Sequence, residues 1–340
     1  MPDSDMCQKL PVSIICPVRN SIADLPAHVE HLGGLSNVVS EIIVVDSQSS
    51  DGTSEYLRES LAGHNVLFLD HPPGLYQSWN HAISKATQEY LTVATVGDVL
   101  PIESLRRIYQ TICDYNADVV VSPPSFLNAD ISKRPCYWPI HDLIEAAGIR
   151  DAAHIPGLVW MIYSIIYMPA SLLSSSAGNL YRTNFLKEHP FPHEYGHPGD
   201  SVWALQMSLK TRWIIDPKAT SYYKIHEKAS HSVSTTQEAF KKLQLDSKLA
   251  LEHAQEDLLG IGLNQSLLRD AFECVNSYGA SALLRKKYAE QRSRLIPSFL
   301  NFGARRCKTL IRKLDADRKS RKMRLNEWTR TGGWSCHESY

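Results

Sequence analysis

Short apolar runs alternate with amphipathic stretches over residues 11–122 of this chain. Five of the runs are almost continuously hydrophobic, which is typical of strands covered on both faces: 12–18, 41–46, 65–69, 90–96 and 118–122. The four stretches between them are candidate helices. Asp51 precedes one of them as a capping residue, and Pro101 stands at the first turn of another. The alternation predicts an α/β fold whose central sheet is mostly parallel.

The alternation stops after residue 122. Residues 152–181 contain no Asp, Glu, Lys or Arg, so we expect a buried segment or one that grazes a membrane surface. A membrane-spanning helix is the less favoured alternative, because only twelve residues separate Pro156 from Pro169 and a bilayer needs about 20.

A second mixed region follows, with a helix expected over 201–210 and strands near 213–215 and 220–225. From about residue 235 the pattern is helical. We therefore expect a domain over 1–234, made of the halves 11–122 and 123–234, and a helical C-terminal extension over 235–340.

The charges balance over the whole chain but not along it. Its 36 Lys and Arg match its 36 Asp and Glu, which excludes the chain-wide basic surface typical of nucleic-acid-binding proteins, so no nucleic acid partner is expected. Residues 281–325, however, carry fifteen Lys or Arg and three acidic residues, interleaved with Leu, Ile and Phe. This pattern favours contact with an anionic membrane surface. A solvated helix packed on the domain is the main alternative, and nucleic acid a weaker one.

The cysteines and the first residues point to a compartment. The seven Cys include no C-x-x-C spacing, which argues against a disulfide framework and a zinc ribbon. Residues 1–10 contain no apolar run, so a secretory signal is not expected. These features predict a cytoplasmic protein, and the basic segment would make it peripheral on the inner face of the membrane.

Polar residues follow the first two predicted strands, where parallel sheets commonly bind ligands. The first strand ends in PVRN and the second in the run VDSQSSDGT, so a nucleotide site is expected there. The chain has neither G-x-G-x-x-G nor G-x-x-x-x-G-K-[ST], and therefore lacks the dinucleotide and P-loop phosphate cradles. A nucleotidyltransferase would need a basic, glycine-rich loop after Val18, and none follows.

Three motifs occur in one order: PVSIICPVRN, EIIVVDSQSSDGT and GLYQSWNHAISKATQEYLTVATVGDVLP. This order resembles the N-terminal half of an inverting family 2 glycosyltransferase with the GT-A, Rossmann-like fold. The resemblance covers about residues 11–121, continues more loosely through 178–234, and does not reach the C-terminal hundred residues. It implies a nucleotide-sugar donor, with UDP-sugars favoured, and a hydroxyl of a glycan or lipid-linked acceptor, in surface polysaccharide synthesis.

The resemblance also implies roles for individual residues on the donor side. Seven of them fall where the family binds the donor: Pro17, Arg19, Asn20, Asp46, Gln77, Asn80 and Asp98. The planar guanidinium of Arg19 could stack on the base. Gln77 and Asn80 have a structural alternative, as polar residues near the start of a helix.

The family's D-x-D metal motif falls at Thr95-Val96-Gly97-Asp98, where only Asp98 is a carboxylate. A pair of carboxylates lets Mg²⁺ or Mn²⁺ bridge the diphosphate, because hard cations take oxygen ligands. With Thr95 and Gly97 in place of the other acidic residues, we expect weak cation affinity supplied mainly by the donor phosphates. The resemblance makes Asp98 and His226 the candidate metal ligands.

The general base that inversion requires matches Asp200, in the segment HPGDSVWALQ. Asp200 could instead only cap the following helix, and the two roles are compatible. Lys224 and His226 fall where the family closes over the diphosphate, with His231 as the nearest competitor of His226. The alternative to an enzyme is a binding or assembly module that holds a nucleotide sugar without turnover, because its D-x-D motif is degenerate.

Overall fold

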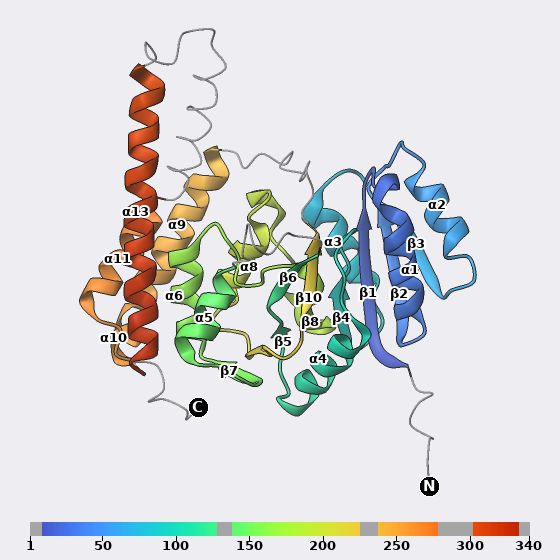
Figure 1. Cartoon of the computed structure of the whole chain (residues 1–340), viewed down its shortest axis with the longest axis horizontal. Coiled ribbons are helices and arrows are strands. Elements are labelled where there is room, and N and C mark those ends of the chain that lie inside the picture. Colours follow the sequence, from blue (N-terminus) through green and yellow to red (C-terminus); the bar gives the residue numbers. More distant parts are fainter. Residues whose placement is uncertain (1–8, 128–137, 225–236, 278–301, 333–340) are drawn as a thin grey trace.

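An eight-stranded sheet runs through the protein in the order β3-β2-β1-β4-β8-β5-β9-β7 (Figure 1). The computed structural model describes residues 9–127, 138–224, 237–277 and 302–332. The strands of this sheet are β1 (Leu10–Val18), β2 (Val39–Asp46), β3 (Val66–Asp70), β4 (Tyr90–Val93), β5 (Val119–Val121), β7 (Ala153–Ile155), β8 (Asn179–Arg182) and β9 (Trp213–Ile215). A separate parallel pair is formed by β6 (Pro124–Leu127) and β10 (Ser221–Lys224).

The first half of the chain folds as its apolar pattern predicts. All five expected strands form, although β4 ends at Val93, three residues early. The four helices between them are α1 (Leu25–Ser36), α2 (Thr53–Ser60), α3 (Leu75–Lys85) and α4 (Ile102–Asp114). Strands β1 to β4 are parallel, so their carboxyl ends meet at one edge of the sheet; Val18 pairs with Asp46, and Asp46 with Asp70.

Two antiparallel strands interrupt the parallel order in the second half. Strand β8 runs antiparallel to its neighbours β4 and β5, and β7 runs antiparallel to β9. The expected α/β fold with a mostly parallel sheet is therefore confirmed. Because β8 follows residue 123 and inserts between β4 and β5, the central sheet crosses the expected division between the two halves.

Side chains of opposite pleat build two cores, one on each face of the sheet. Ile14 and Val44 belong to one buried cluster, whereas Ile15, Ile43 and Val45 belong to the other. This alternation is the consequence of a strand period of two. Both faces of β1 and β2 are therefore covered, as their continuous hydrophobic runs predict.

The uncharged segment folds around a buried helix. It contains α6 (Gly157–Tyr167), preceded by α5 (Pro139–Ala147), and nine of the eleven α6 residues are buried. The expectation of a buried segment is confirmed for this helix. Among the described residues, no helix has the length and apolarity needed to cross a bilayer.

The short helices of the second half are α7 (Thr183–Glu188) and α8 (Gly199–Gln206), with 3₁₀ turns at η3 (Ser176–Gly178) and η4 (His193–Tyr195). A further 3₁₀ turn, η2 (Ile22–Asp24), precedes α1 in the first half. The C-terminal region is helical where it is described: α9 (Gln237–His253), α10 (Gln255–Gly260), α11 (Gln265–Asn276) and α13 (Phe302–Arg330). The expected boundary at residue 234 lies outside the described residues, as do residues 281–301 of the basic segment. Helix α13 packs against α5, α6 and α11 and forms the end of the molecule opposite β3 (Figure 1).

Candidate functional site

The loops after β1 and β2 are tied together by Asn20. Its side-chain oxygen accepts a hydrogen bond from the Ser50 backbone amide at 2.8 Å, and its backbone amide donates to Ser49 Oγ at 2.9 Å. Asn20 has a φ of 46°, in the left-handed region that Asn tolerates better than most residues. The Asn20 side chain therefore holds the shape of this edge.

Asp46 lies at the bottom of the same edge. It is buried at the end of β2, and it accepts hydrogen bonds from the amide and hydroxyl of Ser49. Pro17 is partly buried, whereas Arg19 is exposed beside the two loops. An exposed guanidinium above a fixed edge has the freedom to meet a planar ligand.

Asp98 is buried in the turn after β4, with 3% of its surface exposed. The Ser175 hydroxyl donates to its Oδ2 at 2.9 Å, and the Lys224 amide donates to its Oδ1 at 3.0 Å. Burial raises the Asp98 pKa to about 6, against these two hydrogen bonds, which lower it. The carboxyl group is therefore largely ionised at neutral pH.

The other two positions of the turn are filled by neutral residues. Thr95 Oγ1 shares a hydrogen bond with Ser176 Oγ at 2.7 Å, and Gly97 has a φ of 93°, which favours glycine. The turn is therefore shaped by contacts to residues 175 and 176.

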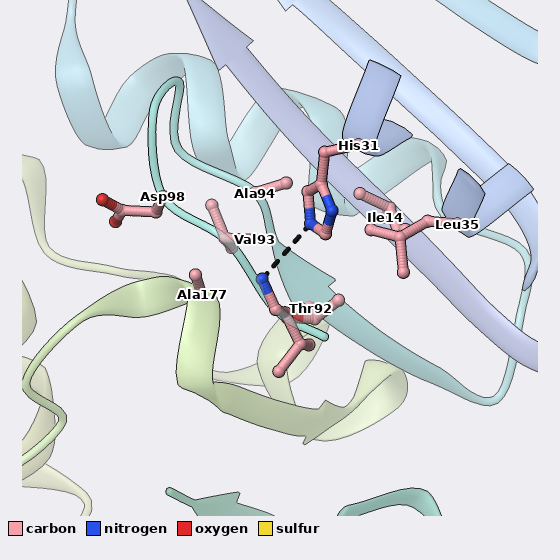
Figure 2. A pocket seen from close by; sticks show the side chains of 9 residues that line it. Ile14, His31, Leu35, Thr92, Val93, Ala94, Asp98 and Ala177 are labelled. Atoms are coloured by element: carbon pink, nitrogen blue, oxygen red, sulfur yellow. Dashed lines mark hydrogen bonds between the residues drawn. The ribbon is translucent and has the colours of Figure 1, made fainter. Parts of the chain in front are cut away.

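A small, mostly apolar pocket opens between β1, β4 and α1 and reaches Asp98 (Figure 2). His31 of α1 lines it, and its Nε2 accepts a hydrogen bond from the Leu100 amide at 3.2 Å. Burial lowers the His31 pKa, which keeps the ring neutral and able to accept this bond. His31 thus holds the chain just after Asp98.

Lys224 lies at the end of β10, next to Asp98. Besides its amide contact with Asp98, its ammonium group pairs with Asp24 Oδ1 at 2.6 Å. The structure therefore brings two predicted site residues together. His226 and His231 lie outside the described residues.

Asp200 stands in the first turn of α8, half-buried against α3. Its Oδ1 accepts a hydrogen bond from the adjacent Ser201 amide at 2.7 Å. The N-cap of α8 is Pro198 and Asp200 is the second residue of the helix, so the alternative role of Asp200 as the cap is wrong. Burial raises the Asp200 pKa above its ordinary value, against that hydrogen bond. The Tyr76 pKa is also raised, mainly because the hydroxyl is buried and in addition because the Asp200 carboxylate is close to it.

Helix α3 contacts the region of Asp200 through two side chains. The Tyr76 hydroxyl donates to the His197 carbonyl at 3.0 Å. Asn80 makes two hydrogen bonds with the Phe191 backbone, at 2.8 and 3.0 Å. The Asn80 amide therefore joins α3 to the chain before α8, while Gln77 is exposed beside Gly74.

Three side chains that contribute to the site were not predicted from the sequence: Tyr76, Ser175 and Ser201. The available signal for Tyr76 was that it adjoins the predicted Gln77. In the structure its ring stacks on that of Phe191, with ring centroids 5.7 Å apart, a contact that only the fold creates. Ser175 lies in a segment without periodicity, so no signal in the sequence points to it.

The described carboxylates do not form a complete metal site. In these parts of the chain, no three His, Cys, Asp or Glu side chains are grouped closely enough to hold a metal ion. Asp98 offers one carboxylate, and both of its oxygens already accept hydrogen bonds. Since Mg²⁺ needs close to six oxygen ligands, these residues do not hold a cation by themselves.

Comparison with known proteins finds a family match in the N-terminal part of the chain. Residues 13–141 match the model of glycosyl transferase family 2. The glycosyltransferase GlyG of Streptococcus pneumoniae serotype 4 is 29% identical over 130 residues, which cover 37% of this chain and 42% of GlyG. The match thus spans less than half the length of that relative.

Solved structures resemble nearly the whole chain. Residues 1–349 of S. aureus TarS in complex with UDP-GlcNAc have a TM-score of 0.59 at 19% identity, covering 96% of this chain and 92% of that one. The mannosyltransferase PcManGT of Pyrobaculum calidifontis, in complex with GDP-Man and Mn²⁺, has a TM-score of 0.51 at 15% identity, covering 98% and 90%. At these identities the resemblance shows the fold, which is GT-A.

Proposed function

Residues 13–141 belong to glycosyl transferase family 2, and on that premise we propose that this chain transfers a sugar from a nucleoside diphosphate donor to an acceptor hydroxyl with inversion. The observation that carries the proposal is the position of Asp200, held at the start of α8 beside Tyr76 of α3. UDP-sugars are the favoured donors, as in the TarS complex with UDP-GlcNAc.

Asp200 acts as the general base in this proposal. Inversion requires one carboxylate that removes the acceptor proton on the face opposite the leaving group. Burial raises the pKa of Asp200, which makes the carboxylate a better proton acceptor near neutral pH. The Ser201 amide fixes one carboxylate oxygen and thereby sets the direction from which the acceptor hydroxyl approaches.

The edge formed by β1, β2 and β4 receives the donor. Pro17 and Arg19 receive the base, on which Arg19 stacks. Asp46 defines the ribose end and is held by Ser49, whose hydroxyl also accepts from the Asn20 backbone amide. Gln77, Asn80 and Asp98 lie toward the sugar and diphosphate. Lys224, beside Asp98, and His226 contribute positive charge or hydrogen bonds to the departing diphosphate.

A divalent cation enters the proposal only together with the donor. PcManGT was solved with GDP-Man and Mn²⁺. Here Asp98 is the one carboxylate of the motif, with His226 as the other candidate ligand. The donor diphosphate would therefore supply most oxygen ligands of Mg²⁺ or Mn²⁺, and such an ion would neutralise charge on the leaving group.

The acceptor is proposed to be a glycan or lipid-linked hydroxyl in surface polysaccharide synthesis, held at the inner face of a membrane. Helix α13 supports this location, because its cations divide between two faces. Arg321 and Arg324 pair with Asp270 of α11, whereas Lys308, Arg312 and Lys319 are exposed at a spacing that places them on one helix face. Met323, 62% exposed, shares that face and could enter the lipid interface.

The alternative function is a binding or assembly module without turnover, which the loss of two motif carboxylates at Thr95 and Gly97 favours. A panel of UDP-, GDP- and dTDP-sugars, assayed with Mg²⁺, Mn²⁺ or EDTA and with acceptor extracts, separates the two. Transfer from one donor supports the enzyme. Tight donor binding without transfer under every condition supports the module instead.

A further inference from the structure

One stretch of chain touches both candidate carboxylates. The bridging segment, residues 168–176, leaves the C-terminal end of α6 and reaches the turn of η3. Near its start, the Pro169 carbonyl accepts a hydrogen bond from Ser201 Oγ at 2.9 Å, and the Ser201 amide binds Asp200. Near its end, Ser175 donates to Asp98.

The bridging segment is closely held between these two contacts. Leu172, Leu173 and Ser175 are buried, and the Asn179 side chain donates to the Leu173 carbonyl at 2.9 Å. Ser174 has a φ of 59°, a left-handed conformation uncommon for serine, which its surroundings must maintain. A displacement at one end is therefore transmitted to the other, because the segment has little room to absorb it.

The start of the segment is anchored by α13 as well as by the end of α6, where the Met168 amide donates to the Ser164 carbonyl at 3.0 Å. Arg318 donates a hydrogen bond to the Met168 carbonyl, at the C-terminal cap of α6. Lys322, one turn further along α13, lies 3.9 Å from the centre of the Tyr167 ring. Since α6 has no charged residue of its own, these two cations also face the negative end of its helix dipole.

We propose that Arg318 is a positioning residue for transfer: through Met168 and the bridging segment it sets Asp200 relative to Asp98. This inference rests on the proposed function of those two carboxylates. Arg318 itself touches neither of them. It gives the C-terminal extension a role in the reaction that is separate from any membrane contact.

The test compares Arg318→Ala with Arg324→Ala in the full chain. Arg324 is the matched control, because it is also an arginine of α13 that binds another element, but its partner is Asp270 of α11, at 2.6 and 2.7 Å. Amide hydrogen exchange is the first measurement. We expect Arg318→Ala to speed exchange about tenfold in residues 168–176 and 199–201, and Arg324→Ala to leave both stretches unchanged.

Steady-state kinetics are the second measurement. Arg318→Ala should lower kcat for transfer between about tenfold and a hundredfold while leaving donor binding unchanged, since a small displacement of a catalytic group is costly. Arg318→Lys should restore part of the rate. Equal effects of the two Ala variants on exchange and kcat would overturn the proposal, because they would show only general loosening of α13.

The two measurements separate this inference from the proposed function. If wild-type protein transfers no sugar from any donor, the proposed function fails, yet the exchange experiment still tests whether Arg318 holds the bridging segment. If wild-type protein is active and Arg318→Ala changes neither exchange nor kcat, the inference alone fails.

Discussion

The ring of Tyr76 occupies the space that a side chain at Gly199 would need. A Cβ on Gly199 would lie 2.5 Å from Tyr76 Cε2 and 2.7 Å from the Pro192 carbonyl oxygen. Such distances are far below van der Waals contact, so the residue before Asp200 can sit against α3 only as glycine. The close approach fixes the start of α8, and with it Asp200, against α3.

Gly199→Ala should therefore reduce both stability and transfer. Overpacking at a buried position costs about 1–3 kcal/mol in the free energy of unfolding, and here it also displaces Asp200. Gly34→Ala is the control, because Gly34 lies inside α1 and a Cβ there would meet nothing within 4 Å. Thermal unfolding and a transfer assay on both variants check this; equal stability of the two would show that the contact with Tyr76 is loose.

The ionised, buried carboxylate of Asp98 should lower the free energy of unfolding at neutral pH. Its folded pKa of about 6 exceeds the ordinary 3.8, so the folded state holds the proton more tightly than the unfolded state between these values. The free energy of unfolding therefore falls as pH rises from 4 to 6, and the cost is complete above 6.

Asp98→Asn should remove that cost, because a neutral amide can still accept from the Lys224 amide. We expect stabilisation of up to about 3 kcal/mol at pH 8, almost none at pH 4, and loss of transfer. Denaturant unfolding at both pH values measures this. Destabilisation at pH 8 would mean that the ionised carboxylate is favoured in its buried site.

Cation binding should depend on the donor. Without donor, Asp98 alone gives too few oxygen ligands, so titration calorimetry with Mn²⁺ should detect only weak, millimolar binding. Adding a nucleoside diphosphate should strengthen it at least tenfold, and Asp98→Ala should reduce that gain. Tight Mn²⁺ binding to the free protein would contradict this, and would point to ligands outside the described residues, with His226 the first to substitute.

The exposed face of α13 should bind anionic vesicles. Replacing Lys308, Arg312 and Lys319 together by Glu should weaken sedimentation with vesicles rich in phosphatidylserine at least tenfold, since each cation near such a surface contributes about 1 kcal/mol. The same replacement at three exposed cations elsewhere, Arg150, Lys210 and Lys241, serves as the control. Equal losses in both variants would show that only total charge matters.

The parallel half of the sheet could be predicted because its strands are continuously apolar. Residues such as Ile14 and Ile43 are buried on opposite faces, so the strands differ plainly from the amphipathic helices between them. Strand β8 could not be recognised in the same way. It is four residues long and begins with Asn179, whose burial depends on contacts with Leu173 and Tyr181 that only the fold creates.

Part of the candidate site could also be predicted, because some of its residues belong to recognisable sequence motifs. Asp98 and Asp200 belong to motifs whose spacing survives in the chain, and both lie at the ends of short elements, as expected. The links between them were not readable, because Ser175, Pro169 and Arg318 come from a segment without periodicity and from a helix about 150 residues away.

The most direct test of the proposed mechanism is sugar transfer by wild-type protein and by Asp200→Asn, with donor binding measured on both. Loss of a general base should reduce kcat at least about a hundredfold, while the donor dissociation constant stays within twofold. Glu256→Gln, a substitution at an exposed position of α10, is the control and should leave both transfer and donor binding unchanged. Transfer by Asp200→Asn at the wild-type rate would contradict the assignment of Asp200 as the base, and with it the mechanism proposed for this site.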